Sequence, residues 1–513
     1  MAFMIAPQAA ARGADAALID ERGSTSWQAL NVRTNQLMHW LSGRGIKPGD
    51  RIAIFAGNCR EYYEIISAAG HLGVTFVPIN WHFAAEELEY VVADAGCRIL
   101  FIEGPFEALA AGLEDCERIS IRGDAYLDYE DCLAGQSTEE PASQFMGGPM
   151  FYTSGTTGRP KGVKGKSPAA ADGPPPIQAM QMMTGGLTTM LQIPADGTTF
   201  ICGPVYHSAQ WAFSFLPLMA GSRVLMRHKF DAAESLELID QYQVTNTHLV
   251  PTQFRRMLKV DDEHRGAFSG GSLRVVWHGA APCPPEVKRA MIDWWGPVVS
   301  EYYGSTEGSI VAMSSAEEWL ERPGTVGKPS PTVNIQIFGE DGEPVPAGTS
   351  GEIYVRSLMG TDFEYHNEPE KTAAVHKEPG LFTFGDIGYF DDDGYLYLSD
   401  RKIDMIISGG VNIYPAEIEG VLATHPAVQD VAVFGIPNEE YGEEVKAAVT
   451  LNAGFSGDSG LTDDLMAFCR EHLAGYKTPR SVDYVDEMPR HETGKLYKRL
   501  LKEPYWEGTG RSI

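Results

Sequence analysis

The chain contains Phe151-Tyr152-Thr153-Ser154-Gly155-Thr156-Thr157-Gly158-Arg159-Pro160-Lys161-Gly162-Val163, a loop of hydroxyl groups and glycines that closes on one lysine. A short apolar run leads into it and predicts a strand that ends where the loop begins. The glycines let backbone N–H groups approach an anion, the hydroxyls donate hydrogen bonds, and Lys161 adds positive charge. The stretch is therefore suited to a polyphosphate.

This loop has two alternative interpretations, a Walker A loop and an ordinary surface turn. It is not a Walker A loop, because that motif places Ser or Thr directly after Gly-Lys, whereas Lys161 stands between Pro160 and Gly162. Glycine, serine, threonine and proline also make ordinary surface turns. Composition alone does not distinguish an ordinary surface turn from a phosphate-binding loop.

The stretch from Tyr152 to Val163 closely resembles the signature loop of the adenylate-forming enzymes, the superfamily of acyl-CoA synthetases, peptide-synthetase adenylation domains and firefly luciferase. The resemblance implies that Lys161 contacts the phosphates of ATP. It assigns the same nucleotide to the loop residues Thr153, Ser154, Gly155, Thr156, Thr157 and Gly158.

Length and composition bound the architecture. The 513 residues exceed one ordinary core and predict a large unit with a smaller domain. No apolar run is long enough to span a membrane, and the N-terminus lacks the basic start of a secretory signal, so we expect a cytoplasmic protein. The seven cysteines are scattered, without a Cys-x-x-Cys pair, and predict neither a disulfide framework nor a zinc site.

The formal net charge of −28 bears on the partners. It disfavours binding to nucleic acid or to anionic membranes through the overall field. An anionic substrate such as ATP then needs local cations, namely Lys161, other basic side chains and a divalent metal.

Strands alternate with helices along the first part of the chain. Short apolar runs at 51–55, 74–78 and 98–102 are separated by helix-length segments at 61–72 and 85–95, and a helix is expected from Trp27 to Gly43. This order predicts an α/β fold with a mainly parallel sheet covered on both faces. Residues 164–176, rich in Gly, Ala, Ser and Pro, are expected to form a loop.

A strand followed by an aromatic segment is the candidate acyl site. His207, Trp211 and Phe213 follow the apolar run at 199–202, and the resemblance implies that they contact the substrate near its carboxylate. Trp277 and His278, which end a later strand, are further candidates for the acyl pocket. A lone histidine among aromatic residues is otherwise more often structural.

Two glycine turns follow predicted strands and match the family. Gly279, Ala280 and Ala281 are small enough for a planar group to lie against the backbone, and the resemblance makes them one wall of the adenine pocket. In the segment 298–308, the resemblance implies that Tyr303 stacks on adenine and that Thr306 bonds the α-phosphate or the substrate carboxylate. Glu307 is the implied magnesium ligand, because a carboxylate beside a triphosphate is repelled unless a cation lies between them.

A third match lies at 380–388. Asp386 is placed where a carboxylate can accept both ribose hydroxyls, and Arg401 matches an ATP-contacting arginine of the family. The family's hinge residue, usually Asp or Lys, falls two positions later, where this chain has Ile403 followed by Asp404. The chain therefore departs from the family pattern at the hinge residue, though not at the expected place of the hinge.

The resemblance divides the chain into an N-terminal adenylation domain, residues 1–402, and a mobile C-terminal domain, residues 403–513. The expected fold is a large α/β region of parallel and mixed sheets flanked by helices, plus a small α+β domain. Gly409 and Gly410 would leave room for the pantetheine arm of coenzyme A. Lys495, in the run Thr493-Gly494-Lys495-Leu496, matches the family's catalytic lysine.

These motifs together predict an acyl-CoA synthetase that uses ATP, Mg²⁺ and coenzyme A, with no prosthetic group, on a fatty or related lipid acid such as an alicyclic or steroid acid. An aromatic-acid CoA ligase, a stand-alone adenylating enzyme and a luciferase-like oxygenase are alternatives. A peptide-synthetase domain is disfavoured, since no aspartate for an amino group stands near His207. A nucleotide-binding pseudoenzyme would be expected to lack Lys495 or Glu307. A homodimer is a candidate assembly.

Overall fold

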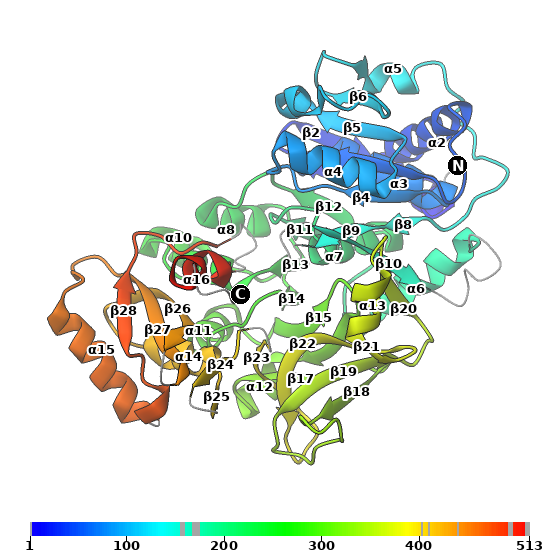
Figure 1. Cartoon of the computed structure of the whole chain (residues 1–513). Helices are drawn as coiled ribbons and strands as arrows, with labels where there is room; N and C mark the ends of the chain where they lie inside the picture. Colours follow the sequence, from blue (N-terminus) through cyan, green and yellow to red (C-terminus); the bar gives the residue numbers. More distant parts are fainter. Residues whose placement is uncertain are drawn as a thin grey trace.

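The computed structural model describes residues 3–153, 160–166, 175–401, 404–408, 411–438, 441–473, 475–490 and 496–507 (Figure 1). Over these residues the chain forms β-sheets of 14, six, five and three strands. Helices flank the two largest sheets. The expected α/β fold with parallel and mixed sheets is confirmed.

Six parallel strands form the sheet at the top of Figure 1. Their order is β7 (Leu127–Asp128), β6 (Glu117–Ile121), β5 (Ile99–Glu103), β3 (Arg51–Phe55), β4 (Thr75–Pro78) and β8 (Gly148–Pro149). The accompanying helices are α2 (Trp27–Gly43), α3 (Arg60–Leu72), α4 (Ala85–Ala95), η1 (Gly104–Ala110) and α5 (Tyr129–Leu133). Because α3 and α4 connect successive parallel strands, the predicted alternation of strands and helices is confirmed here.

The 14-stranded sheet changes from parallel to antiparallel strands along its length. Its order is β18 (Val333–Phe338), β19 (Gly351–Ser357), β22 (Leu381–Phe390), β23 (Leu396–Arg401), β17 (Thr325–Pro329), β16 (Ser309–Ser314), β15 (Val299–Ser305), β14 (Val275–His278), β13 (Asn246–Leu249), β11 (Thr198–Ile201), β12 (Arg223–Met226), β1 (Ala16–Asp20) and β2 (Gly23–Ser26), with β21 (His376–Glu378) beside β22. The strands from β15 to β1 are parallel, whereas those from β16 to β18 are antiparallel.

The helices of this central region are α1 (Ala6–Arg12), α6 (Ile177–Met190), α7 (Ser208–Ala220), α8 (Ala232–Gln241), α9 (Pro251–Met257), α10 (Asp262–Ala267), α11 (Pro285–Trp295), α12 (Ala316–Glu321) and α13 (Pro369–Val375). Helix α11 has proline at its first position, which suits the start of a helix. Helix α6 was not predicted from the sequence.

A small antiparallel sheet, in the order β20 (Asp362–Tyr365), β10 (Lys161–Lys166) and β9 (Phe151–Thr153), flanks the predicted phosphate loop, with β9 before it and β10 after it. The expectation of a loop from residue 164 is wrong for residues 164–166, because Lys164 and Lys166 pair with Glu364 and Asp362 of β20. Cross-strand pairing with a segment about 200 positions away overrides the local composition. Residues 167–174 lie outside the described residues.

The last sheet belongs to the C-terminal part, drawn in orange and red in Figure 1. It contains β25 (Val411–Ile413), β24 (Ile406–Ser408), β27 (Gly442–Leu451) and β26 (Val428–Asn438), with β28 (Ser481–Tyr484) beside β27. Its helical elements are α14 (Pro415–Leu422), α15 (Ser459–His472), η3 (Gly475–Lys477) and α16 (Lys498–Trp506). Ile418 and Leu422 from α14 and Leu465 and Cys469 from α15 share one buried core, as their spacing predicts.

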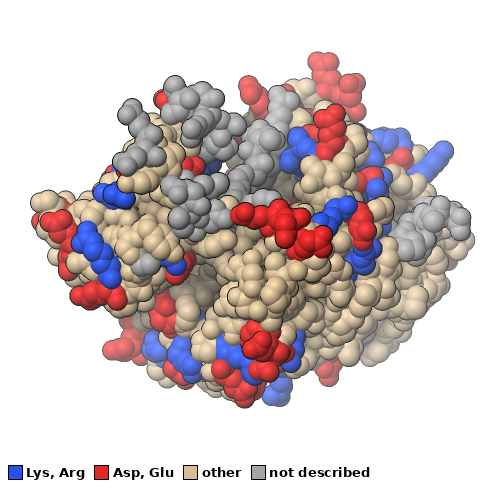
Figure 2. Space-filling view, turned by 60° about the horizontal axis from the view of Figure 1, so that its bottom comes forward, with Lys and Arg blue, Asp and Glu red and all other residues tan. Residues whose placement is uncertain are grey.

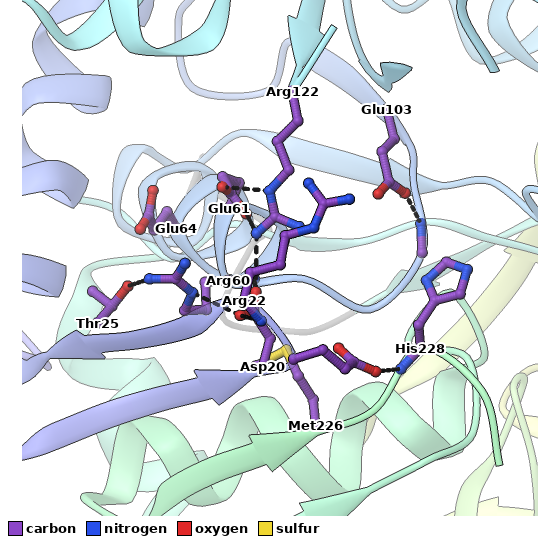
Figure 3. A network of polar contacts seen from close by, with 12 residues as sticks. Asp20, Arg22, Thr25, Arg60, Glu61, Glu64, Glu103, Arg122, Met226 and His228 are labelled. Atoms are coloured by element: carbon purple, nitrogen blue, oxygen red, sulfur yellow. Dashed lines mark hydrogen bonds and ion pairs between the residues drawn. The ribbon is translucent and has the colours of Figure 1, made fainter. Parts of the chain in front are cut away.

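Buried charges join the two large sheets (Figure 3). Asp20, at the end of β1, has a side chain that is only 1% exposed. Its carboxylate contacts Arg60 Nε at 3.1 Å and Arg122 Nη2 at 2.9 Å, and these arginines extend from α3 and from the end of β6. Burial alone would raise the pKa of Asp20, but the bonds from Arg122, the Arg22 N–H and Arg60 hold it below its usual value.

The surface and the cysteines agree with the sequence. Figure 2 shows Asp and Glu side chains spread over one face and interspersed with Lys and Arg. All seven cysteines are free, and all except Cys283 are buried. Among the described residues, no helix is both long and apolar enough to cross a bilayer. The cytoplasmic location stays a prediction.

We expect Asp20→Asn to lower the free energy of unfolding by about 2 to 3 kcal/mol at neutral pH, because it leaves two arginines without their shared anion. The folded-state pKa of Asp20 lies below the unfolded one, so its contribution is complete above about pH 4 and is lost as the pH falls through the folded pKa. Thermal unfolding of wild type and variant at neutral pH and at pH values below about 4 measures this, and the difference should shrink at the lower pH.

Asp50→Asn is the matched control for this prediction. It removes an Asp–Arg pair with Arg98 in the same part of the molecule, but both of its side chains are about a third to a half exposed. Little change is expected there, since solvent screens such pairs. Equal effects of the two substitutions at neutral pH would contradict a special role for the buried pair.

Candidate active site

The predicted phosphate loop is held at both of its ends. Thr153 ends β9, Lys161 begins β10, and the two residues are direct partners across the antiparallel pair. Pro160 is fixed as well, because its carbonyl accepts a hydrogen bond from the hydroxyl of Tyr90 at 3.3 Å. The loop residues Ser154, Gly155, Thr156, Thr157 and Gly158 lie outside the described residues, so their role stays a prediction.

Lys161 stands among charged side chains and one aromatic ring. Its Nζ lies 5.1 Å from the centre of the Tyr365 ring. Burial lowers the pKa of Lys161, and the nearby positive charge of Lys371 lowers it further, whereas the carboxylates of Glu368 and Glu307 act in the opposite direction. Lys161 and its surroundings therefore contain two cations and two carboxylates, a mixture of charges that suits a metal and a polyphosphate.

The turn between β15 and β16 carries the predicted catalytic pair. The Thr306 hydroxyl lies 2.9 Å from the hydroxyl of Ser208, the first residue of α7. Glu307 Oε1 accepts a hydrogen bond of 3.0 Å from the Tyr365 hydroxyl. The turn is tight, because a Cβ on Gly304 would lie 2.0 Å from the Ser309 carbonyl oxygen.

Glu307 can take part in holding Mg²⁺. Among the described residues no group of three or more acidic, histidine or cysteine side chains is arranged as a metal cage. Magnesium at nucleotide sites is usually held by one or two carboxylates together with phosphate oxygens and water, and the second oxygen of Glu307 is suited to that use. The residues present therefore fit a magnesium ion that Glu307 and the phosphates would hold together.

The two predicted nucleoside residues touch each other. The hydroxyl of Tyr303 donates a hydrogen bond of 2.6 Å to Asp386 Oδ2, and so joins β15 to β22. Arg401, the last residue of β23, is the direct cross-strand partner of Asp386. The Arg401 side chain lies outside the described part of the structure. The structure therefore brings Tyr303, Asp386 and the Arg401 backbone together.

The small-residue turn after β14 is closely packed. A Cβ on Gly279 would lie 2.6 Å from the ring of Tyr302 and 2.9 Å from its carbonyl oxygen. Ala280 has a φ of 65°, which is unusual for a residue other than glycine. Such strain often accompanies function, and a role for the turn of Gly279, Ala280 and Ala281 against adenine agrees with it.

Aromatic rings gather between β14, β15 and α7. Phe213 lies 6.2 Å from Trp277, 5.2 Å from Tyr302 and 4.8 Å from His248, measured between ring centres. Burial lowers the pKa of His248 to about 3, so its imidazole is neutral at physiological pH. The nitrogens of that ring lie 2.8 Å from Gln210 Nε2 and 3.1 Å from the Tyr302 hydroxyl. The cluster is therefore uncharged.

The other predicted acyl residues lie apart from this cluster. Trp211 points to the opposite side of α7 from Phe213 and packs on Phe215, Phe76 and Phe151. His278 is fully buried 5.3 Å from Phe254, on the other face of β14 from Trp277, because side chains alternate along a strand. Trp277 and His278 therefore do not line one pocket together.

His207 stands at the start of helix α7. It precedes α7 directly, and its ring centre is 4.3 Å from that of Tyr206. The next residue, Ser208, contacts Thr306. His207 therefore stands one residue from the link between α7 and the Thr306 turn, and its contact with substrate stays a prediction.

Most of the site residues predicted in the C-terminal part lie outside the residues that the structure describes. Gly409, Gly410 and Lys495 lie outside the described residues, as does Ile403. Their neighbours are placed: Ser408 pairs with Val411 across β24 and β25, and Arg490 forms an isolated antiparallel bridge with Leu496. Both glycines and Lys495 thus lie in segments with paired ends.

Sequence reasoning missed Tyr302, His248, Ser208 and Tyr365. Tyr302 carried a usable signal, because it precedes Tyr303 on one strand and must face the other way. Ser208 follows His207 directly and could have been included. Tyr365 and His248 lie far along the chain from the motifs they contact, and only tertiary structure brings them there.

The chain matches two family sequence profiles. Residues 5–360 match the AMP-binding enzyme family, and residues 417–495 match the AMP-binding enzyme C-terminal domain. The chain is 33% identical over 495 residues to a feruloyl-CoA synthase of an Amycolatopsis species, with 94% of both chains covered. It is 33% identical over 511 residues to a medium/long-chain-fatty-acid–CoA ligase of Mycobacterium tuberculosis, covering 94% of this chain and 86% of that protein.

Solved structures agree with this. The ATP-bound RpMatB-BxBclM chimera B1 has a TM-score of 0.84 at 28% identity, with 99% of both chains covered. The o-succinylbenzoate CoA synthetase of Bacillus subtilis, in complex with its acyl-adenylate intermediate, has a TM-score of 0.82 at 26% identity over 98% of both chains. The chain therefore belongs to the AMP-binding enzyme family, in its branch of AMP-forming acyl-CoA synthetases, which are acid–thiol ligases.

Proposed function

We propose that the protein joins an apolar carboxylic acid, a fatty acid or a related alicyclic or steroid acid, to coenzyme A through an acyl-adenylate, with release of AMP and pyrophosphate. The main support is that Lys161 and Glu307 come together around Tyr365, while Tyr303 bonds Asp386. These pairs supply a phosphate-binding side and a nucleoside-binding side of one site.

In the first half-reaction, an oxygen of the acid bonds to the α-phosphorus of ATP, and the bond from that phosphorus to the pyrophosphate oxygen breaks. The reactants are all anions, so positioning and charge neutralisation dominate the catalysis. Lys161, with Thr153 and the loop residues, holds the β- and γ-phosphates. Thr306 donates its hydroxyl at the α-phosphate or the carboxylate.

Glu307 would hold the magnesium ion, which when bound supplies positive charge between the phosphates. Tyr303 would stack on adenine beside the turn of Gly279 to Ala281, and Asp386 would accept the ribose hydroxyls. Because Tyr303 already bonds Asp386, the two sides of the nucleoside would be fixed relative to each other.

In the second half-reaction, the sulfur of coenzyme A bonds to the acyl carbon, the thiol proton is released, and the bond to AMP breaks. We propose that residues 403–513 form the moving domain, with the hinge near Ile403 and the pantetheine arm passing Gly409 and Gly410. Lys495 would serve the first half-reaction and withdraw in the second. The Arg255–Asp430 contact, 3.5 Å long, joins the two proposed domains and would break on rotation.

The uncharged cluster of Phe213, Trp277, Tyr302 and His248 is the candidate environment for the acyl tail. Burying an apolar tail there leaves no charge unpaired, which favours fatty and alicyclic acids over amino acids. Aromatic acids are the second candidate, because planar rings can stack on the rings of this cluster.

A screen of pyrophosphate release tests the proposed function and the acid. We expect release with medium-chain or alicyclic acids, and coenzyme A should raise the turnover and yield the thioester. Amino acids should give no release above background. Preference for aryl acids of similar size would move the assignment to an aromatic-acid ligase. Release without thioester formation would identify a stand-alone adenylating enzyme, oxygen-dependent light emission a luciferase-like oxygenase, and nucleotide binding without any turnover a pseudoenzyme.

Lys495→Ala should all but abolish adenylation, lowering its rate by about a hundredfold or more, if the lysine stabilises developing charge. It should spare thioester formation from a supplied acyl-adenylate, since the lysine is needed only in the first half-reaction. Rapid-quench assays of the two half-reactions measure this. Arg499→Ala, which removes an exposed cation paired with Glu503 four positions away, is the control and should change neither rate. Equal loss of both half-reactions in Lys495→Ala would refute the assignment.

A further inference from the structure

Tyr365 joins two parts of the site that different sheets carry. Lys161 belongs to the three-stranded sheet, whereas Glu307 lies in a turn of the 14-stranded sheet. The Tyr365 ring lies under the Lys161 ammonium, and its hydroxyl donates to Glu307 Oε1. One side chain thus contacts both the predicted phosphate lysine and the predicted metal ligand.

The backbone of Tyr365 is tied to the strand that carries Lys161. Tyr365 is the cross-strand partner of Val163, so its side chain and that of Lys161 project from the same face as diagonal neighbours. The Tyr365 N–H donates to Thr372 Oγ1 at 2.9 Å, and the next N–H, of His366, donates to the Gly162 carbonyl at 2.7 Å.

The ring of Tyr365 is also fixed on its apolar side. Phe363, only 1% exposed, meets it edge to face with ring centres 5.2 Å apart and an angle of 77°. The hydroxyl therefore has little freedom of position, because both the backbone and the ring are restrained. A restrained donor fixes its acceptor, and here the acceptor is the Glu307 carboxylate.

We propose that Tyr365 is a positioning residue, which holds the Glu307 carboxylate at a set place beside Lys161 so that one oxygen stays directed at the metal of the metal–ATP complex. The inference rests on the proposed role of Glu307. A carboxylate has two oxygens, and Tyr365 occupies Oε1 while Oε2 remains for the ion. Groups that orient metal-binding carboxylates commonly contribute tenfold or more to metal affinity.

The test is Tyr365→Phe, which removes the hydroxyl and keeps the ring against Phe363 and Lys161. We expect Mn²⁺, used as a paramagnetic probe in place of Mg²⁺, to bind about tenfold more weakly to the enzyme–ATP complex. Electron paramagnetic resonance of free Mn²⁺ measures this without turnover. Affinity for AMP, which needs no metal, should stay the same, as should the KM for the acid. Excess metal should restore adenylation.

Tyr129→Phe is the matched control. It also removes a tyrosine hydroxyl bonded to a carboxylate, Glu64 Oε2 at 2.9 Å, but in the part of the molecule that contains the six-stranded sheet. It should leave Mn²⁺ affinity unchanged, and circular dichroism should show both variants folded.

Glu307→Gln separates the inference from the function on which it rests. If Glu307→Gln weakens Mn²⁺ binding and Tyr365→Phe does not, the positioning role is refuted and the metal role of Glu307 stands. If neither variant changes Mn²⁺ binding to a wild-type complex that does bind the ion, the metal role of Glu307 is itself refuted. A loss of AMP affinity equal to the loss of metal affinity in Tyr365→Phe would mean a general disturbance and would also overturn the inference.

Discussion

The direct pairing of Thr153 with Lys161 is the constraint on which the site depends. A loop that must accept a polyphosphate gains from ends that are already close together, because the entropy of closing it has been lost during folding rather than during binding. The chain obtains this with a pair of short strands, and β20 covers the other edge of β10. The overall charge of −28 makes the constraint more important, since the local cations must act against an unfavourable field.

The proposed site groups stand on different strands, helices and turns, and specific side-chain contacts set their distances. Tyr365 connects the small sheet to Glu307, Tyr303 connects β15 to Asp386 on β22, and Ser208 connects α7 to Thr306. Each contact uses a hydroxyl, which forms a hydrogen bond without adding charge. Tyr365 and Tyr303 donate theirs to carboxylates, whereas Ser208 and Thr306 pair two hydroxyls. Hydroxyl contacts of this kind therefore lie at the proposed metal, nucleoside and acyl sides of the site, and they would leave the positive charges for the phosphates.

The sequence predicted the parallel strands, their helices and the glycine turns well, because those features depend on local pattern: helix α4 begins and ends at Ala85 and Ala95, as expected. It failed where distant pairing decides the structure. Residues 164–166 have the composition of a loop yet form a strand against β20. Trp211 and His278 were chosen by residue type, but helical and strand periodicity direct them away from Phe213 and Trp277. Tyr365 has no local signal, since its importance comes from two contacts across sheets.

The contact between Ser208 and Thr306 joins two elements that carry different kinds of side chain. Helix α7 contributes Phe213 to a neutral cluster of rings in which burial keeps His248 uncharged, whereas Thr306 is followed directly by Glu307. An acid placed across this contact would bury its tail among the rings, where each square ångström of apolar area contributes about 25 cal/mol, and keep its carboxylate with the charged groups. Recognition of the tail and activation of the carboxylate then use different residues. If the tail binds there as proposed, substitutions among the rings would change which acid is used while the adenylating groups stay as they are.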